Sequence, residues 1–216
     1  MHRSRGASAR KSPKKNKNTY WSRSKITTRQ REILNRHPGC VIWLTGFSGA
    51  GKSTIAIRLE QALYKLRRHA YILDGDNIRQ GLCSDLGFSH DDRTENIRRI
   101  GEAARLFADA GIICIAAFIS PYRADRDLAR RIAPKGKFLE VYVNAPLEVC
   151  EERDPKGLYA RARAGKLKNF TGISAPYEPP LKPEIKLDTN QLSVNECVGI
   201  ILKRLDKLLP AANKRR

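Results

Sequence analysis

The stretch Gly46-Phe-Ser-Gly-Ala-Gly51-Lys52-Ser53 fits the pattern G-x-x-x-x-G-K-[ST] at every fixed position. It stands between an apolar run, Cys40 to Leu44, and a segment from Lys52 to Arg67 in which apolar residues recur at helical spacing. Glycines let the backbone wrap around a phosphate without Cβ clashes, and the following helix directs its positive end at the same group. We therefore predict a phosphate-binding loop between a buried strand and a helix.

The residue types of this loop suit the binding of ATP together with Mg²⁺. The Lys52 ammonium group would neutralise the β- and γ-phosphates, and the Ser53 hydroxyl would be a ligand of Mg²⁺. Backbone N–H groups of the loop would bind phosphate oxygens. The candidate nucleotide-binding residues are Gly46, Phe47, Ser48, Gly49, Ala50, Gly51, Lys52, Ser53 and Thr54.

Outward from the loop, predicted strands and helices alternate along the chain. Strands are expected at residues 40–44, 70–73, 112–119, 138–143 and 185–187. Helices are expected at residues 52–67, 91–110, 125–132, 147–152 and 194–209, with a further short helix that begins near Thr27-Thr28 and docks on the body. The alternation predicts an α/β fold of the P-loop NTPase type, a parallel sheet with helices on both faces.

Composition indicates a soluble globular protein of 216 residues, 41% of them hydrophobic and 30% charged. Because no run of 18 apolar residues occurs, we expect no membrane span, and the basic start lacks the apolar stretch of a secretory signal. No two of the five cysteines are spaced as a CxxC pair. They favour a reducing, cytoplasmic setting over a disulfide framework or a zinc site.

The net charge of +20 is concentrated at the two ends of the chain. Residues 1–31 hold eleven Lys or Arg and no acidic residue, and residues 210–216 add three more basic residues. We predict a disordered basic tail over 1–18, one folded domain over 19–209 and a basic C-terminal tail over 210–216. The N-terminal tail is interpreted as a solvated segment, with nonspecific contact to nucleic acid as the alternative.

A phosphate-binding loop is shared by several enzyme classes, which other features separate. The chain has no N-K-x-D segment for reading guanine and is short for a motor ATPase. It also lacks the H-R-D and D-F-G signatures of protein kinases. The sequence therefore favours a kinase that acts on a small molecule or a nucleotide.

More polar residues follow the predicted strands, at the edge of the sheet where open α/β proteins bind ligands. Asp74 and Asp76 follow the second strand, where a carboxylate could hold Mg²⁺ or orient a hydroxyl. Asp76 or Asn77 could instead cap a helix. The segment 153–168 is rich in basic residues, and we interpret it as a mobile cationic lid over phosphates.

Several blocks in a fixed order resemble the adenylyl-sulfate kinase (APS kinase) family over residues 19–209. They are the phosphate loop, LDGDNIRQGL (73–82), DLGFSHDDRTENIRRIGEAARLFADAG (85–111), FISPYRADRDLAR (118–130), EVCEERDPKGLYARARAGKLKNFTGI (148–173) and PYEPP (176–180). The resemblance implies transfer of the ATP γ-phosphoryl group to the 3′-hydroxyl of adenosine 5′-phosphosulfate (APS). The product would be 3′-phosphoadenosine 5′-phosphosulfate, made in sulfate assimilation. It also implies ATP and Mg²⁺ as cofactors and a homodimer.

The resemblance assigns roles to single residues as well. The candidate catalytic residues are Lys52, Asp74 and Ser120, and the candidate metal ligands are Ser53 and Asp74. The candidate substrate-binding residues are Asp76, Arg79, Phe88, Arg93, Asn96, Ile119, Ser120, Lys168 and Phe170. Phe88 and Phe170 match two rings that sandwich the adenine of the acceptor. Arg153 is a candidate nucleotide contact. Two roles are open for Ser120, namely a phosphoserine intermediate and a substrate contact.

Two other functions compete with this interpretation. One is a different small P-loop kinase, acting on a nucleoside monophosphate or a sugar acid, and the DGDN, ENIRR and FISP blocks argue against it. The other is a relative that binds nucleotides or nucleic acid without catalysis. The presence of Lys52, Ser53, Asp74 and Asp76 argues against this loss of activity.

Overall fold

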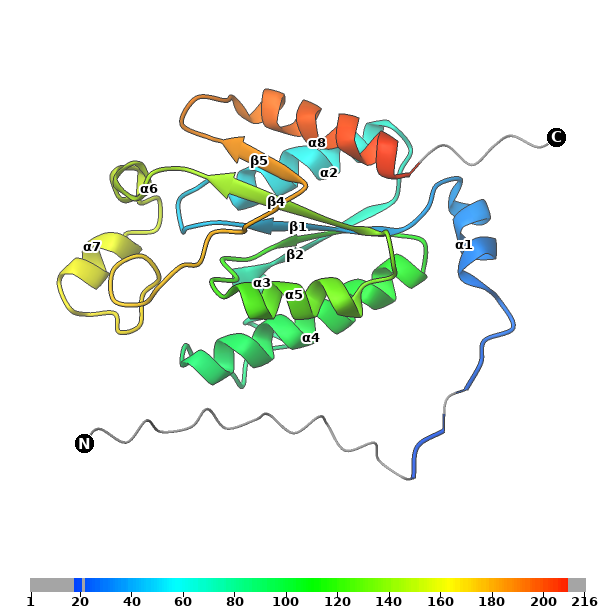
Figure 1. The fold of residues 1–216 in the computed structure, drawn as a ribbon, viewed down its shortest axis with the longest axis horizontal. Helices are drawn as coiled ribbons and strands as arrows, with labels where there is room; N and C mark the ends of the chain where they lie inside the picture. The colour runs from blue at the N-terminus through cyan, green and yellow to red at the C-terminus, as the bar shows by residue number, and fades with distance from the viewer. Residues whose placement is uncertain (1–17, 21, 210–216) are drawn as a thin grey trace.

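The computed structural model describes residues 18–20 and 22–209, and a five-stranded parallel sheet forms its centre (Figure 1). The strands are β1 (Cys40–Thr45), β2 (Ala70–Asp74), β3 (Ile113–Ala117), β4 (Phe138–Asn144) and β5 (Ile185–Asp188), in the order β2-β3-β1-β4-β5. The predicted fold class and its five strands are confirmed. The predicted tails, 1–18 and 210–216, lie outside the described residues except for Asn18.

The position of each strand in the sheet explains its sequence pattern. Strands β1 and β3 are interior strands, and every one of their residues is buried. Both faces of such a strand meet apolar side chains, so its sequence is a continuous hydrophobic run. Strand β5 lies at an edge, and its residues alternate between buried and exposed at Ile185, Lys186 and Leu187.

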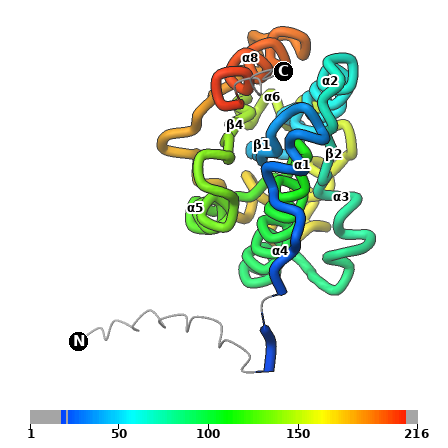
Figure 2. The backbone as a smooth tube through the Cα atoms, turned by 90° about the vertical axis from the view of Figure 1, so that its right-hand side faces the viewer, coloured from blue at the N-terminus to red at the C-terminus, as the bar shows by residue number. Residues whose placement is uncertain are grey.

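Helices cover both faces of the sheet (Figures 1 and 2). On one face, α2 (Lys52–Lys65) packs against α8 (Val194–Leu208). On the other face, α4 (His90–Asp109) packs against α5 (Arg123–Ile132). Strand β1 contributes to both cores, because Ile42 belongs to the α2–α8 side and its neighbour Trp43 to the α4–α5 side.

The long helices begin at residues that the sequence marks as caps. Ser89 caps α4 and Ser193 caps α8, each in a capping box. The predicted N-terminal helix is α1 (Thr28–Asn35), capped by Thr27. It docks on the end of α4, where the Arg31 guanidinium pairs with the Asp109 carboxylate at 3.0 Å. The predicted docking of this helix on the body is therefore confirmed.

The structure also contains two short helices that the sequence analysis did not predict, α3 (Gly75–Ile78) and α7 (Leu158–Arg163), beside the expected α6 (Leu147–Arg153). The cap of α3 is Asp74, whose carboxylate accepts the Asp76 N–H at 3.0 Å. The capping role offered to Asp76 or Asn77 was therefore wrong. Among the described residues, no helix is long and apolar enough to cross a membrane.

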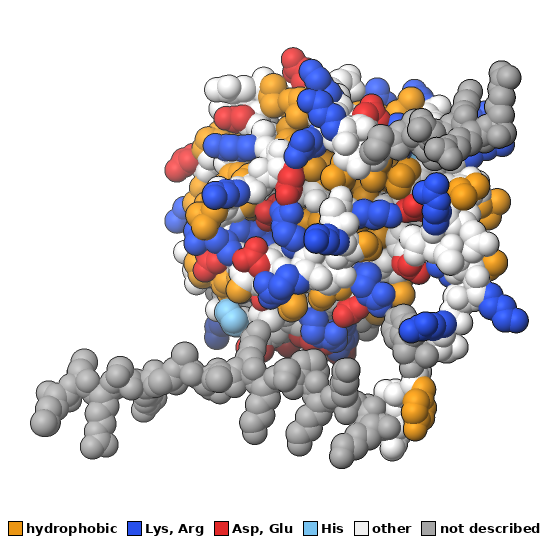
Figure 3. Space-filling model, turned by 45° about the vertical axis from the view of Figure 1, so that its right-hand side comes forward, with side chains coloured by type: hydrophobic (Ala, Val, Ile, Leu, Met, Phe, Trp, Pro, Cys, Tyr) orange, Lys and Arg blue, Asp and Glu red, His pale blue; other side chains and the backbone are white. Residues whose placement is uncertain are grey.

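Charges of both signs alternate on the face drawn in Figure 3, where Lys and Arg side chains are interspersed with Asp and Glu. Some of them form exposed pairs, such as Arg99 with Asp85 at 2.6 Å. Each such pair contributes little, roughly 0–1 kcal/mol. All five cysteines are buried, free thiols. The fold is therefore stabilised mainly by its two apolar cores.

His37 joins the start of the sheet to the connection between α2 and β2. Its side chain is buried, its Nε2 accepts the backbone N–H of His69 at 2.8 Å, and its Nδ1 lies 3.0 Å from the Pro38 carbonyl oxygen. Since Nε2 accepts, Nδ1 carries the proton and the ring is neutral. Burial lowers the pKa of this ring below its ordinary value of 6.5, and the charges of Arg68 and His69 lower it further.

This lowered pKa predicts a pH-dependent contribution to stability. The unfolded chain binds a proton on His37 near pH 6.5, more readily than the folded chain does. The contribution of His37 is therefore complete above pH 6.5 and is lost as the pH falls through the folded-state pKa. Replacing His37 with alanine leaves the His69 N–H unpaired and should cost about 1–3 kcal/mol at pH 7.5.

Thermal unfolding at pH 7.5 and pH 5.5 measures this effect. We expect the melting temperature of His37→Ala to lie below that of the wild type at pH 7.5 and to approach it at pH 5.5. His90→Ala is the matched control, because the His90 side chain is exposed. An equal deficit of His37→Ala at both pH values would contradict the prediction.

Candidate active site

The phosphate-binding loop connects β1 to α2, as predicted, and two of its glycines are required by close packing. Gly46 and Gly49 have positive φ angles of 152° and 76°. A Cβ atom at Gly46 would lie 2.2 Å from the Val143 carbonyl oxygen, and one at Gly49 would lie 2.8 Å from that of Cys150. Any larger residue would displace the loop from β4 and α6, so these glycines set its shape.

Lys52 is held in place by the loop itself. Its Nζ donates to the carbonyl oxygens of Gly46 at 3.1 Å and Phe47 at 2.6 Å, and the residue is only 8% exposed. Burial lowers the pKa of the ammonium group to about 8, so it remains largely protonated at pH 7. A positive charge that is already ordered and partly desolvated is well suited to binding phosphate oxygens.

Ser53 and Asp74 meet although they lie on different elements. The Ser53 hydroxyl, in the first turn of α2, donates to Asp74 Oδ2 at 2.7 Å at the carboxyl end of β2. A hydroxyl and a carboxylate are oxygen donors of the kind that Mg²⁺ prefers. In the described ranges no group of three or more His, Cys, Asp or Glu could hold a metal ion. The donor set therefore fits a Mg²⁺ ion held by one or two side chains and by substrate phosphates.

Asp76 and Lys156 form an ion pair that reaches across the site. Asp76 is on α3, and Lys156 follows α6 in the predicted lid. Both side chains are more than half exposed. Asp76 is a predicted site residue and Lys156 is not, although Lys156 lies inside a block that carries the resemblance.

Phe88 is framed by the two candidate acceptor arginines. The Arg79 guanidinium carbon lies 4.3 Å from the ring centroid, and that of Arg93 lies 5.7 Å away. Arg93 also donates to the carbonyl oxygen of Asn169 at 2.6 Å and to Thr171 Oγ1 at 3.1 Å, so it ties α4 to residues just after the lid segment. Burial lowers the pKa of both guanidinium groups.

Ser120 follows β3 in a left-handed conformation with φ of 41°, which is uncommon for a residue with a side chain. The residue is 2% exposed, and its Oγ accepts the indole N–H of Trp43 at 3.1 Å. The only other hydrogen-bond partner of Oγ in the described structure is the Phe118 carbonyl oxygen at 3.5 Å. Neither partner is a base that could activate the hydroxyl.

One cavity of about 810 Å³ brings most of the predicted residues together. This volume lies in the upper part of the range for small-molecule sites. The predicted residues that line it are Ser48, Gly49, Ala50, Gly51, Lys52, Ser53, Thr54, Asp74, Asp76, Arg79, Phe88, Arg93, Asn96, Ile119, Ser120, Arg153, Lys168 and Phe170. Gly46 and Phe47 do not line it. Gly46 packs on β4, and the Phe47 ring lies 4.8 Å from that of Tyr177.

The cavity wall is strongly cationic. Its charged members are the two carboxylates Asp74 and Asp76 and six Lys or Arg side chains, namely Lys52, Arg79, Arg93, Arg153, Lys156 and Lys168. The Oδ1 atom of Asn96 is buried on the same wall without a hydrogen-bond partner. The wall thus favours polyanionic ligands and holds one acceptor that a ligand N–H or O–H could satisfy.

Residues far away in the sequence support the phosphate-binding loop. The Tyr159 hydroxyl donates to the Ser48 carbonyl oxygen at 2.9 Å, and the Thr189 hydroxyl donates to that of Ala50 at 2.9 Å. Arg153 donates to the Gly49 carbonyl oxygen at 3.4 Å and to that of Thr189 at 2.7 Å. Neither residue was predicted from the sequence. Tyr159 lies inside a block that carries the resemblance, whereas no quoted block includes Thr189.

These features define a class of protein. A phosphate-binding loop with an ordered lysine and a Ser–Asp pair lines a cationic cavity. Aromatic and arginine side chains line the same cavity. The carboxyl ends of the parallel strands meet here, as in other ligand sites of open α/β sheets. The fold and the site together are those of a small P-loop kinase.

Comparison with known proteins identifies the family. The family model described as adenylylsulphate kinase matches residues 38–188. The chain is 55% identical over 190 residues to the adenylyl-sulfate kinase of Marinobacter nauticus, an alignment that covers 88% of this chain and 96% of that protein. The chain therefore belongs to the adenylyl-sulfate kinase family and is a kinase that transfers phosphate to a hydroxyl group of adenylyl sulfate.

Solved structures agree with this assignment. The APS kinase of Mycobacterium tuberculosis, solved in complex with AMPPNP and APS, has a TM-score of 0.75 and 44% identity to the chain. The match covers 78% of this chain and 98% of that one. A hexameric APS kinase from Thiobacillus denitrificans has a TM-score of 0.60 and 32% identity, and it covers 80% of this chain and 30% of its own. The fold and the family thus coincide with the predicted ones.

Proposed function

We propose that the 810 Å³ cavity binds both substrates at once and moves the γ-phosphoryl group of ATP directly to the 3′-hydroxyl of APS. The products are ADP and 3′-phosphoadenosine 5′-phosphosulfate, the activated sulfate donor. One observation carries this proposal. A single cavity joins the phosphate-binding loop to a second wall that carries Arg79, Phe88 and Arg93. A donor and an acceptor that are both anionic nucleotides need such a site.

On the donor side, the proposed roles follow from charge and position. The backbone N–H groups of the loop bind the phosphates, and Lys52 neutralises charge on the transferred group. Ser53 and Asp74 would hold Mg²⁺, which supplies further charge neutralisation when it is bound. The Asp74 carboxylate, which lines the cavity, would also orient the acceptor hydroxyl. Loose phosphoryl transfer depends mainly on positioning, so a strong base is not required.

On the acceptor side, we assign adenine stacking to Phe88 and Phe170 and anion binding to Arg79 and Arg93. Arginine presents a planar fork of N–H donors that matches phosphate and sulfate oxygens. Phe88 is 57% exposed, as a ring awaiting a partner would be. The unpartnered Oδ1 of Asn96 supports a further hydrogen bond to the acceptor.

We assign Ser120 a role in shaping the acceptor wall rather than as a phosphoserine intermediate. An intermediate needs a hydroxyl that is exposed to the γ-phosphate and activated by a base. Ser120 is instead buried, with 2% of the residue exposed, and its hydroxyl accepts a hydrogen bond from Trp43. Direct in-line transfer requires no such step.

The segment 153–168 is proposed to close over the bound phosphates as a lid. Two contacts support this role: Arg153 binds the back of the phosphate-binding loop, and Lys156 reaches Asp76 on the opposite wall. When ATP or APS is bound, its phosphates offer Lys156 a stronger partner than the exposed Asp76 carboxylate does.

Assembly and location complete the proposal. We propose a homodimer, supported by the family resemblance and by the exposed Tyr71 on edge strand β2. Sedimentation velocity tests it, with a single monomeric species as the contradicting result. The five free thiols and the use of ATP support a cytoplasmic location, which imaging of the tagged chain in its native cell tests.

The acceptor assignment is tested by replacing Phe88 with alanine. Stacking of a base on an aromatic ring contributes about 1–3 kcal/mol, so we expect APS to bind roughly tenfold more weakly or worse. ATP binding should change by less than about twofold, because Phe88 lies outside the phosphate-binding loop. Calorimetry with APS and with a nonhydrolysable ATP analogue measures both affinities.

Tyr64→Ala is the matched control, since Tyr64 is a similarly exposed aromatic residue near the end of α2. It should leave both affinities unchanged. Unaltered APS binding by Phe88→Ala, or equal weakening of both ligands, would overturn the acceptor assignment.

A further inference from the structure

The loop after β3 adopts a conformation that needs external support. Ser120 has a positive φ, and such backbone strain persists only where the surroundings fix it. Thr45 supplies part of the support by donating to the Ile119 carbonyl oxygen at 2.7 Å. Residues 118–121 line the active-site cavity, so the shape of this loop is the shape of one wall.

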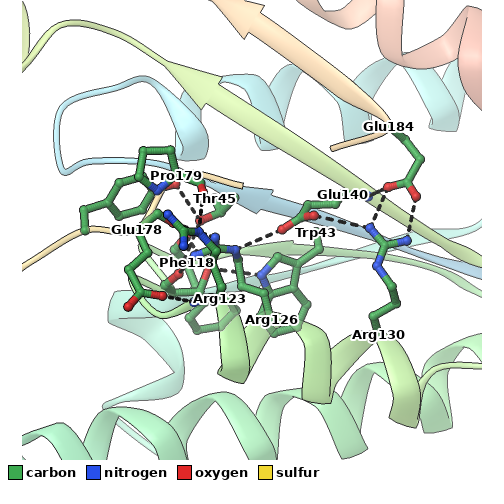
Figure 4. A network of polar contacts seen from close by, with 12 residues as sticks. Trp43, Thr45, Phe118, Arg123, Arg126, Arg130, Glu140, Glu178, Pro179 and Glu184 are labelled. Carbon is green, nitrogen blue, oxygen red and sulfur yellow. Dashed lines mark hydrogen bonds and ion pairs between the residues drawn. The ribbon is translucent and has the colours of Figure 1, made fainter. Parts of the chain in front are cut away.

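Arg126 on α5 supplies a second support of this loop (Figure 4). Its Nη1 donates to the Ser120 carbonyl oxygen at 2.6 Å. Its Nη2 donates to the Glu178 carbonyl oxygen at 2.6 Å, and its Nε donates to Glu140 Oε1 at 2.9 Å. The side chain is 3% exposed. One buried guanidinium thus joins the Ser120 loop, strand β4 and the segment 176–180.

Glu178 makes further hydrogen bonds between the segment 176–180 and the residues that follow Ser120. Its backbone N–H donates to the Pro121 carbonyl oxygen at 2.8 Å, and its carboxylate accepts the Arg123 N–H at 2.8 Å. The segment 176–180 also reaches the rear of the phosphate-binding loop, where Tyr177 packs against Phe47 and its hydroxyl lies 3.1 Å from Thr45 Oγ1. Arg126 therefore contacts both the Ser120 loop and the segment 176–180, which support each other.

We propose that Arg126 is a positioning residue for the acceptor, acting through the backbone of Ser120. This inference rests on the proposed function, which places the acceptor against the wall formed by residues 118–121. The Phe118 ring adjoins Gly75, next to Asp74, so this wall lies beside the candidate hydroxyl-orienting carboxylate. This positioning role also explains why α5 carries a buried cation at residue 126.

Arg130, one helical turn further along α5, offers a matched comparison. It shares the Glu140 carboxylate, at 3.3 Å, and pairs with both Glu184 oxygens at 2.6 and 2.8 Å. Its polar contacts therefore go to strand β4 and to the start of β5 rather than to the Ser120 loop (Figure 4). Loss of Arg130 disturbs the ion network without releasing the cavity wall.

The test measures the KM for APS, the KM for ATP, kcat and the melting temperature of three proteins, namely wild type, Arg126→Gln and Arg130→Gln. For Arg126→Gln we expect the KM for APS to rise about tenfold or more, since small misplacement of a substrate is costly. The KM for ATP should stay within about twofold. Arg130→Gln should lower the melting temperature while both KM values stay near those of the wild type.

Removing Arg126 alone leaves the buried Glu140 with less compensation and could prevent folding. The double variant Arg126→Gln/Glu140→Gln removes both charges and keeps the proposal testable. Arg126→Lys gives a further readout. Arg126 reaches its three acceptors from three separate nitrogens, whereas the three donors of a lysine lie on a single nitrogen that cannot span those positions. Arg126→Lys should therefore restore the melting temperature more fully than the KM for APS.

These measurements distinguish a failure of the positioning role of Arg126 from a failure of the proposed function. A wild type without APS-dependent ADP release would defeat the proposed function itself. An active wild type with an unchanged KM for APS in the folded Arg126 variants would defeat only the positioning role. Equal rises in both KM values, or the same rise in Arg130→Gln, would also overturn it.

Discussion

Replacing Lys52 with alanine is expected to reduce kcat by about 10²–10³-fold, while the protein remains folded. The Lys52 residue is 8% exposed, and its ammonium group is oriented by the carbonyl oxygens of Gly46 and Phe47. It is therefore in place before the reaction begins. No other part of the phosphate-binding loop carries a full positive charge, so the lost interaction with the transferred phosphoryl group has no local replacement.

The pKa of Lys52 adds a second expectation. Burial lowers it to about 8, and bound phosphates favour the charged form and so raise it again. The KM for ATP should therefore increase as the pH rises above 8 in the wild type, because ATP must then bind together with a proton. The Lys52→Ala variant should lose this dependence.

Steady-state kinetics with matched thermal unfolding checks both expectations. Lys65→Ala is the control, since Lys65 is an exposed lysine at the other end of the same helix. Its kcat should equal that of the wild type. Near-normal turnover by a folded Lys52→Ala protein would overturn the assignment of the loop.

Asp74→Asn is the second substitution with a large expected effect. It removes one negative charge, but its remaining side-chain oxygen can still accept the Asp76 N–H that begins α3. We expect kcat to fall about 100-fold and the Mg²⁺ concentration needed for half-maximal rate to rise. The reason is that the Ser53–Asp74 pair, joined at 2.7 Å, loses its anionic member.

A magnesium titration of the reaction rate separates metal binding from folding. Asp188→Asn provides the control, because Asp188 ends β5 and its carboxylate accepts the Asn190 N–H of a turn. It should keep the wild-type magnesium dependence. If Asp74→Asn keeps it as well, Asp74 is not a metal ligand.

The sequence was sufficient for the fold because its strongest signals are local. A buried strand, a glycine-rich loop and an amphipathic helix follow one another over residues 40–67, and each can be interpreted from its own pattern. The short helices α3 and α7 were missed because four and six residues are too few to show a period. Such helices depend on caps and tertiary contacts, as the Asp74 cap shows.

The site was predicted where motifs mark it and missed where contacts are distant. Lys52, Ser53 and Asp74 follow from motifs and from the resemblance. Arg126 is one of many arginines in the sequence, and only the fold shows that it meets the Ser120 carbonyl oxygen and Glu178. The left-handed turn at Ser120 was also out of reach, because no glycine marks it.

Transfer of phosphate from ATP to APS within one cavity is best tested by measuring ADP release. The protein is supplied with Mg²⁺, ATP and one acceptor at a time: APS, AMP, shikimate or gluconate. We expect ADP release that depends on APS, with a product phosphorylated at the 3′ position. ADP release with another acceptor in place of APS, or none with any acceptor, would contradict it.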